Sequence, residues 1–257
     1  MLQRFERGRE RRALARRAIP ELLWQRTLSR LPFLARLDAA DRAELRRLSS
    51  LFLDRKEFSG AHGLRVSDEM AVAIAAQACL PVLRFGLAPY DGFVGIVVQP
   101  DEVRVRREFA DDDGIVHEYD DVLSGEAMEG GPVMLSWHDV GLAGESAAWG
   151  YNVVIHEFAH VLDMGDGIAD GVPPLPDAAA RRAWLATLQA EFDAFAARVD
   201  DGVDTLLDPY AAEAPEEFFA VASEAFFVAP LDLKHEQPAM YDLLAGYYRQ
   251  DPAACAG

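Results

Sequence analysis

The stretch YNVVIHEFAHVLDMGDG, residues 151–167, places two histidines four residues apart, with a glutamate directly after the first. In an α-helix, residues i and i+4 lie on one face a turn apart, so His156 and His160 can direct imidazole nitrogens at a single point. Zinc binds histidine nitrogen at about 2.0–2.1 Å, which suits such a pair. The stretch therefore predicts a helix that carries a metal ion.

The residue between the histidines, Glu157, is the predicted general base. It lies about 100° around the helix from His156, too close to the histidine pair to be a third ligand but placed to reach a water molecule on the metal. Zinc lowers the pKa of such a water to about 7, and a carboxylate that takes its proton leaves a nucleophile for a polarised carbonyl. The pattern therefore favours hydrolytic chemistry.

The stretch also has what a helix needs without a metal. An apolar stripe separate from the histidine face comprises Val154, Phe158, Val161 and Leu162. Asn152 can cap the helix start, and Gly165 or Gly167 can end it. Because the stripe supplies the core contacts, the alternative of two histidines that only pack in the core is disfavoured.

A catalytic zinc takes three protein ligands and keeps one position open, so a third ligand is required. Asp163 is the nearest candidate, but it lies about 10 Å along the helix axis from His156 and its side chain is short. We expect it instead to accept a hydrogen bond from the outer nitrogen of a ligating histidine, or to close the helix end.

Better candidates lie in APEEFFAVASEAFF, residues 214–227, which predicts a largely apolar helix. An inward-facing glutamate on such a helix is costly unless it is paired or bound to a cation. Glu217 and Glu224 share a face two turns apart, and Glu216 precedes them. The pattern favours Glu217 and leaves Glu224 and Glu216 open.

Composition and charge limit the class of protein. The chain has 257 residues, 51% of them hydrophobic, and a formal net charge of −18, which disfavours attraction to nucleic acid or an acidic membrane. Residues 1–20 carry seven arginines against two glutamates. We predict a basic arm over 1–20, either solvated or in contact with an acidic partner, and a single domain over 21–257.

The predicted location is the cytoplasm. No run approaches the roughly 18 uninterrupted apolar residues of a membrane span, and no apolar segment of a signal peptide follows the first arginines. Only two cysteines are present, Cys79 and Cys255, which fits a reducing compartment better than a disulfide framework.

Three ordered motifs give the chain a resemblance to a known family. They are GPVMLSW (131–137), NVVIHEFAHVLD (152–163) and DPYAAEAPEEFFAVASEAFF (208–227), supported by LPVL (80–83), GLAPYDGF (86–93) and DDDGIVH (111–117). Together they resemble the Mlc titration factor A family, zinc metallopeptidases of the glutamate-zincin group, over roughly residues 20–252. A more distant resemblance is to the catalytic domain of anthrax lethal factor.

The resemblance implies specific roles. His156, His160 and Glu217 would be the zinc ligands and Glu157 the catalytic base. Tyr210, seven residues before the third ligand, would stabilise the developing oxyanion. The strand GPVMLSW, residues 131–137, resembles the edge strand on which zincins lay an extended substrate.

The predicted fold is an α+β zincin-like domain with the active-site helix beside a small mixed sheet and with N-terminal and C-terminal helices. Helices are expected within 21–55 and 67–80, at 176–199 and 208–227, and near 243–250. Strands are expected at 92–100, 102–109 and 131–140, and a solvated loop or hairpin, rather than a calcium site, across the acidic segment 101–129.

The predicted function is zinc-dependent hydrolysis of a peptide substrate, with aminopeptidase-like activity implied by the resemblance. The alternative is a regulatory protein that sequesters a transcriptional repressor of the Mlc type and so affects sugar uptake, with catalysis incidental. A purely structural zinc is a third reading, disfavoured because no cysteine lies near and Glu157 would have no task.

Overall fold

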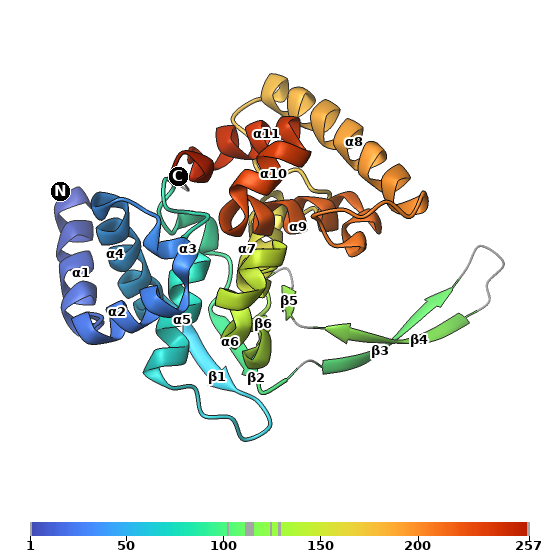
Figure 1. Ribbon diagram of the computed structural model, residues 1–257. Coiled ribbons are helices and arrows are strands. Elements are labelled where there is room, and N and C mark those ends of the chain that lie inside the picture. The colour runs from blue at the N-terminus through green and yellow to red at the C-terminus, as the bar shows by residue number, and fades with distance from the viewer. Residues whose placement is uncertain (1, 102, 111–115, 124, 128–129, 256–257) are drawn as a thin grey trace.

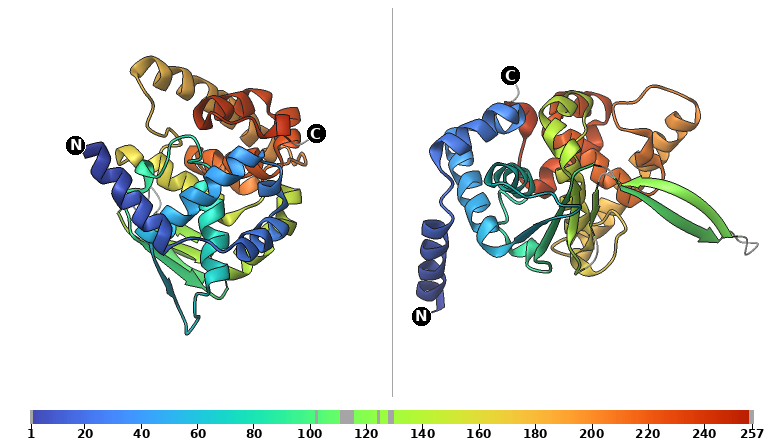
Figure 2. Two further views of the ribbon diagram at one scale, coloured as in Figure 1. Left: turned by 90° about the vertical axis from the view of Figure 1, so that its left-hand side faces the viewer. Right: turned by 90° about the horizontal axis from the view of Figure 1, so that it is seen from below.

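The computed structural model describes residues 2–101, 103–110, 116–123, 125–127 and 130–255. Figures 1 and 2 show the N-terminal helices on one side of the molecule and the C-terminal helices on the other, with strands between them. The fold is α+β, as predicted. None of the helices formed by the described residues combines the length and apolar character that a membrane-spanning segment needs.

The N-terminal side is built from five helices. They are α1 (Leu2–Arg16), α2 (Glu21–Arg30), α3 (Pro32–Ala35), α4 (Ala39–Arg55) and α5 (Asp68–Cys79). The side chains of Asp38 and Ser67 cap α4 and α5, because each accepts a hydrogen bond from a backbone N–H in the first turn. Pro32 is the first residue of the short helix α3.

Helix α1 contains most of the basic segment that the sequence predicts as an arm. It contacts α4, Ala13 is buried, and Arg16 pairs with Asp54 at 3.0 Å. Glu10 pairs with Arg47, also on α4. The separation of 1–20 from the following domain stays a prediction.

The four-stranded sheet has the order β1 (Glu57–Gly60), β2 (Gly95–Gln99), β6 (Val133–Ser136), β5 (Gly125–Ala127). The strands β1, β2 and β6 are parallel, and β5 is antiparallel to β6. Ile96 pairs with Val133 and Val98 with Leu135, and all four side chains are buried because alternate residues face the core. The sheet is therefore mixed and small, as expected.

The strand order corrects one expectation. The strand within GPVMLSW is β6, which lies between β2 and β5 and is not an edge of the sheet. Among the described strands, β5 is the edge next to it. The strand also ends earlier than the predicted 131–140, because the Ser136 side chain caps α6 (Trp137–Ser146) by accepting a hydrogen bond from the backbone N–H of Asp139.

The acidic segment forms a hairpin where it is described. Strands β3 (Val103–Ala110) and β4 (Val116–Leu123) pair antiparallel, with Val103 opposite Leu123, and project from the body of the molecule (Figure 1). Residues 111–115 of the motif DDDGIVH lie outside the described residues.

Helix α7 (Val153–Asp163) carries the quoted motif through the centre of the molecule. Asn152 caps it by accepting a hydrogen bond from the N–H of Ile155 at 2.9 Å. Phe158 is fully buried, with ring centroids 5.0 Å from Tyr90 and 5.6 Å from Phe52. This apolar face fixes the rotation of α7 and leaves the opposite face free for the histidines.

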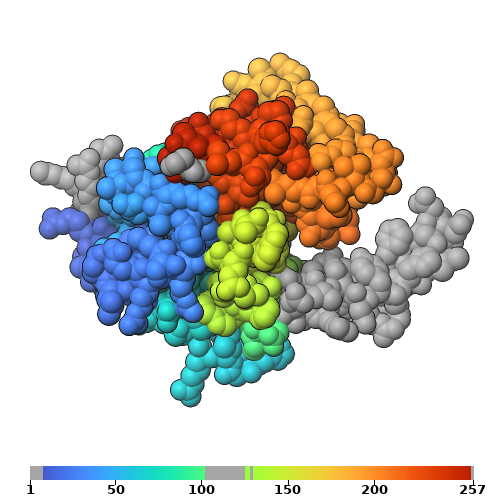
Figure 3. Space-filling view, in the orientation of Figure 1, coloured from blue at the N-terminus to red at the C-terminus, as the bar shows by residue number. Residues whose placement is uncertain are grey.

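The C-terminal side comprises α8 (Ala178–Asp200), α9 (Pro215–Val228), α10 (Pro230–Glu236) and α11 (Pro238–Tyr248). Helix α9 packs directly on α7, and α8 and α11 cover α9. In the space-filling view, the yellow-green segment that includes α6 lies next to both the N-terminal and the C-terminal helices, which also touch each other directly (Figure 3). The contact between α7 and α9 brings the histidines and the glutamates together.

Candidate metal centre

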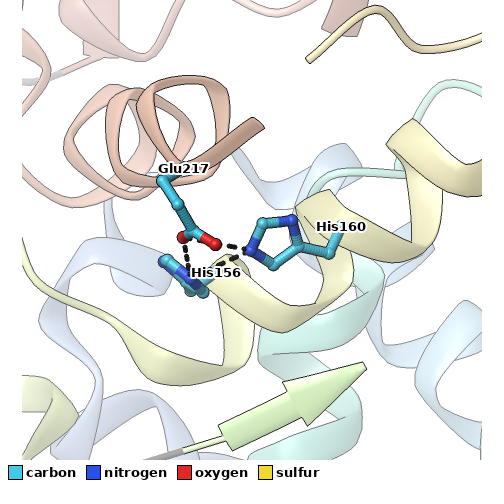
Figure 4. Close-up of side chains that lie close together, drawn as sticks. All are labelled: His156, His160 and Glu217. Atoms are coloured by element: carbon cyan, nitrogen blue, oxygen red, sulfur yellow. Dashed lines mark hydrogen bonds and ion pairs between the residues drawn. The ribbon is translucent and has the colours of Figure 1, made fainter. Parts of the chain in front are cut away.

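Two helices supply the side chains of the site. His156 and His160 project from one face of α7, and Glu217 projects from the first turn of α9. The three side chains point toward one another (Figure 4). Pro215 at the start of α9 favours the helix start that presents Glu217, because its fixed φ suits the first helical position.

The donor atoms lie at the spacing that a tetrahedral ion requires. Nε2 of His156 is 3.1 Å from Nε2 of His160. Oε2 of Glu217 is 3.2 Å from the first nitrogen and 3.4 Å from the second. Metal–ligand bonds of about 2.0–2.1 Å place tetrahedral ligands about 3.3 Å apart. The three side chains therefore fit a zinc-sized ion without rearrangement.

The charges of the cluster also favour a cation. Burial opposes protonation of His156, but the carboxylates of Glu217 and Glu224 outweigh it and raise the pKa of the ring well above its usual range. Burial likewise opposes ionisation of Glu217, but the two imidazoles hold its pKa well below normal. Oε2 of Glu217 is buried and has no hydrogen-bond partner among the described residues. A bound cation would satisfy this oxygen and the ring nitrogens together.

Glu224 contacts the His156 ring on the side away from Glu217. Its side chain is 1% exposed, and its Oε1 lies 2.8 Å from Nδ1 of His156, the nitrogen that faces away from Glu217. Its Oε2 accepts a hydrogen bond from the backbone N–H of Asn152, and burial raises its pKa. Glu224 thus contacts the outer nitrogen of His156, the position from which carboxylates commonly orient metal-binding histidines.

Asp163 lies at the end of α7 and is fully buried. Its Oδ2 accepts a hydrogen bond from the backbone N–H of Gly171 at 2.9 Å. Burial raises its pKa to about 6. Of the two tasks expected for Asp163, this contact matches closing the helix end, while the contact to an outer histidine nitrogen is made by Glu224.

The side chain of Glu157 lies against strand β5 and is not part of the group of potential metal ligands. It is 4% exposed, and burial together with the neighbouring carboxylates raises its pKa to about 8. Its Oε2 is buried without a hydrogen-bond partner among the described residues. Gly125 on β5 leaves the space for this side chain, because a Cβ atom there would lie 2.3 Å from Oε1 of Glu157. The sequence around Gly125 carries no signal that would have identified it.

Tyr210 lies in a short 3-10 helix, Pro209–Ala212, which contacts α9. Its ring centroid is 6.5 Å from that of His156, and the residue is 40% exposed. Asp208 fixes the turn by accepting a hydrogen bond from the backbone N–H of Tyr210 at 2.9 Å. The phenol ring therefore lies near the ring of His156 and is accessible to solvent.

The three glutamates left open by the pattern lie at different distances from the two histidines. Among the described residues, the group of potential metal ligands consists of His156, His160 and Glu217. Glu216 is not part of this group, and Glu224 contacts His156 at its other nitrogen.

Comparisons with known proteins support a metallopeptidase. The profile of a family described as glucose-regulated metallo-peptidase M90 matches residues 5–249. An Mlc titration factor A from Pectobacterium atrosepticum is 39% identical over 236 residues, covering 90% of this chain and 87% of the relative. One from Yersinia pestis is 37% identical over 240 residues, covering 90% and 85%. An uncharacterised protein from Synechocystis is 38% identical over 231 residues, covering 89% and 84%.

These matches confirm the resemblance indicated by the three motifs. A metallopeptidase family implies a metal cofactor, and the cluster of two histidines and Glu217 could bind one. The chain therefore belongs to the glucose-regulated metallo-peptidase M90 family.

Proposed function

We propose that the protein hydrolyses peptide or amide bonds with the help of a zinc ion held by His156, His160 and Glu217. The observation that carries this proposal is the convergence of the three donor atoms at 3.1–3.4 Å beside the buried carboxylate of Glu157. When bound, zinc supplies a Lewis acid that activates water and polarises the scissile carbonyl. Two imidazoles and one carboxylate are a ligand set of catalytic rather than structural zinc.

Glu157 is the proposed general base. Its carboxylate accepts a proton from the attacking water and then delivers it to the amine nitrogen that leaves. The side chain of Glu157 extends from α7 to the edge strand β5. A peptide that pairs with β5 through main-chain hydrogen bonds would therefore lie next to this carboxylate. Glu224 holds the ring of His156 in the orientation that binding needs.

Gly125→Ala tests the fit between Glu157 and β5. The added methyl would overlap the glutamate carboxylate, so we expect kcat to fall by about tenfold or more while zinc content stays at the wild-type level. Steady-state kinetics and metal analysis of the purified variant measure both quantities. Gly141→Ala, at an exposed position on α6 where a Cβ atom meets nothing within 4 Å, is the matched control. An unchanged kcat in Gly125→Ala would contradict the proposed position of Glu157.

Tyr210 is the proposed donor to the oxyanion of the tetrahedral intermediate. A phenol can donate a hydrogen bond without carrying charge in the ground state. Tyr210→Phe should lower kcat by about 10²–10³-fold with little change in KM or in zinc content, because only the hydroxyl is lost. A kcat within twofold of wild type would remove Tyr210 from the mechanism.

The proposed activity is tested by metal analysis of the purified protein together with a substrate screen. We expect about one zinc per chain, and hydrolysis of amino-acid anilides if the activity is of the aminopeptidase type or of internally quenched peptides if cleavage is internal. A chelator should abolish hydrolysis, and added zinc should restore it. Activity that survives complete removal of the metal would refute the proposal.

The name of the relatives, Mlc titration factor A, favours a second candidate function. In this proposal the protein binds a transcriptional repressor of the Mlc type and so affects sugar uptake. Binding of the repressor by the wild type, by the chelated protein and by Glu157→Gln should then be equal, because sequestration needs no turnover. Loss of binding in both altered forms would tie the interaction to the catalytic site.

We also propose that the protein acts in the cytoplasm. Cys79 is buried and Cys255 is exposed, and both thiols are free, which suits a reducing compartment. Burial raises the pKa of the Cys79 thiol and keeps it unreactive. Fractionation of cells that express a tagged chain would test this, and recovery in a secreted fraction would contradict it.

A further inference from the structure

A large pocket lies beside the metal centre, at the C-terminal end of α7. Its volume is about 1420 Å³, and it is lined by the segments 85–93 and 130–133, by the end of α7 and the loop after it, and by α8 and α11. The three metal-binding side chains and Glu157 are not part of its lining. The mechanism proposed for the metal centre therefore gives this pocket no role.

The pocket continues the face of α7 that carries the catalytic carboxylate. Val161 and Met164 line the pocket, and they follow Glu157 by four and seven residues, so all three share one face of the helical path. One helical turn is about 5.4 Å long. The pocket therefore begins about one turn beyond the carboxylate of Glu157.

The edge strand β5 also runs from Glu157 toward the pocket. Gly125 of β5 abuts Glu157, and Ala127, two residues later, pairs with Val133, which lines the pocket. Two residues of an extended chain span about 6.6 Å. A peptide paired along β5 thus reaches from the catalytic carboxylate to the pocket within one or two residues.

The lining is chemically suited to an apolar side chain. It includes the rings of Phe85, Phe93, Trp184 and Tyr247 and the aliphatic side chains of Leu175 and Leu243. The charged side chains that line it, such as Asp242 and Arg249, are exposed. Apolar walls with a few polar groups are typical of sites that bind one part of a ligand by burial.

We propose that this pocket receives a large apolar side chain of the peptide substrate, within two residues of the scissile bond. The proposal rests on the proposed peptidase function. In this proposal, residues of α8, α11 and the loop after α7 select the side chain of the substrate, and residues of α7 and α9 carry out the hydrolysis.

Gly246 allows the pocket to be filled without disturbing the fold. It lies on α11, lines the pocket and is exposed, and a Cβ atom there would meet nothing within 4 Å. Gly246→Trp should therefore occupy the pocket, whereas Gly246→Ala should leave it open. Gly92, in the segment 85–93 of the lining, has the same free space, so Gly92→Trp fills the pocket independently. Gly141→Trp on α6 is the matched control outside the pocket.

The test is a binding measurement on zinc-loaded protein that also carries Glu157→Gln. The probes are a tetra-alanine peptide and its four variants with a single phenylalanine, titrated by calorimetry. At least one phenylalanine peptide should bind about tenfold or more tightly than tetra-alanine, because burial of such a side chain contributes about 1.5–3 kcal/mol. Gly246→Trp and Gly92→Trp should each remove this difference, and Gly246→Ala and Gly141→Trp should keep it.

Equal binding of all five peptides would overturn the proposal, as would a phenylalanine preference that survives both tryptophan variants. Thermal melting of each variant establishes that it is folded. If one of the two tryptophan variants does not fold, the other still tests the proposal. Binding is measured without turnover, so the two proposals can fail separately: a phenylalanine preference in a protein whose wild-type form hydrolyses no peptide would refute the peptidase function and leave the pocket assignment standing.

Discussion

Replacing Glu157 with glutamine should abolish turnover while zinc stays bound. Glutamine keeps the size of the side chain in the space that Gly125 leaves for it, but its amide cannot accept and return a proton. We expect kcat/KM to fall by about 10²–10⁴-fold, the usual contribution of a general base. Because Glu157 is outside the group of potential metal ligands, metal analysis should give the wild-type zinc content.

The control for this experiment is Glu145→Gln on α6, which removes a carboxylate from an exposed position. It should keep wild-type kinetics. Comparable turnover in Glu157→Gln and in the wild type would exclude Glu157 as the base. Loss of zinc from Glu157→Gln would instead place this carboxylate among the ligands, against the geometry of the site.

Replacing Glu217 with alanine should remove the metal. Two histidines would remain, and a site with two protein ligands loses both the charge that balances the cation and one corner of the tetrahedron. Loss of a carboxylate that only orients a ligand costs about 10–100-fold in metal affinity, which is the expectation for Glu224→Gln. The effect of Glu217→Ala should exceed that range, and hydrolysis should fall with zinc occupancy.

Glu216 provides the matched control, because it is the adjacent glutamate on the same helix and does not join the cluster. Glu216→Ala should bind zinc as the wild type does. Competition with a chromophoric chelator orders the affinities, and the expected order is wild type and Glu216→Ala, then Glu224→Gln, then Glu217→Ala. A fully loaded Glu217→Ala variant would show that the third ligand is elsewhere.

The features that follow from local geometry were predictable. The spacing of His156 and His160, the cap at Asn152 and the apolar stripe through Phe158 all lie within one helix, whose period relates each residue to its neighbours three and four positions away. The caps at Asp38 and Ser67 were likewise predictable, because they depend on contacts three residues away.

The order of the strands was not predictable in the same way. Both β5 and β6 are short, and hydrogen bonding between strands, not the pattern within one strand, decides which of them lies at an edge. The motif GPVMLSW therefore indicated a strand correctly, but the position at the edge of the described sheet belongs to β5. The space that Gly125 leaves for Glu157 depends on this same order.

The glutamates of α9 likewise separate what the sequence indicates from what the tertiary structure decides. Glu217 and Glu224 share a face of one helix, so the pattern favoured Glu217 without excluding Glu224, and the resemblance implied Glu217. The packing of α9 on α7 places Glu217 at Nε2 of His156 and Glu224 at Nδ1 of the same ring. The sequence of α7 sufficed for the two histidines because helix geometry relates residues close in the chain. The positions of the two carboxylates around the His156 ring required the tertiary structure, because they depend on distances between residues more than 60 positions apart in the chain.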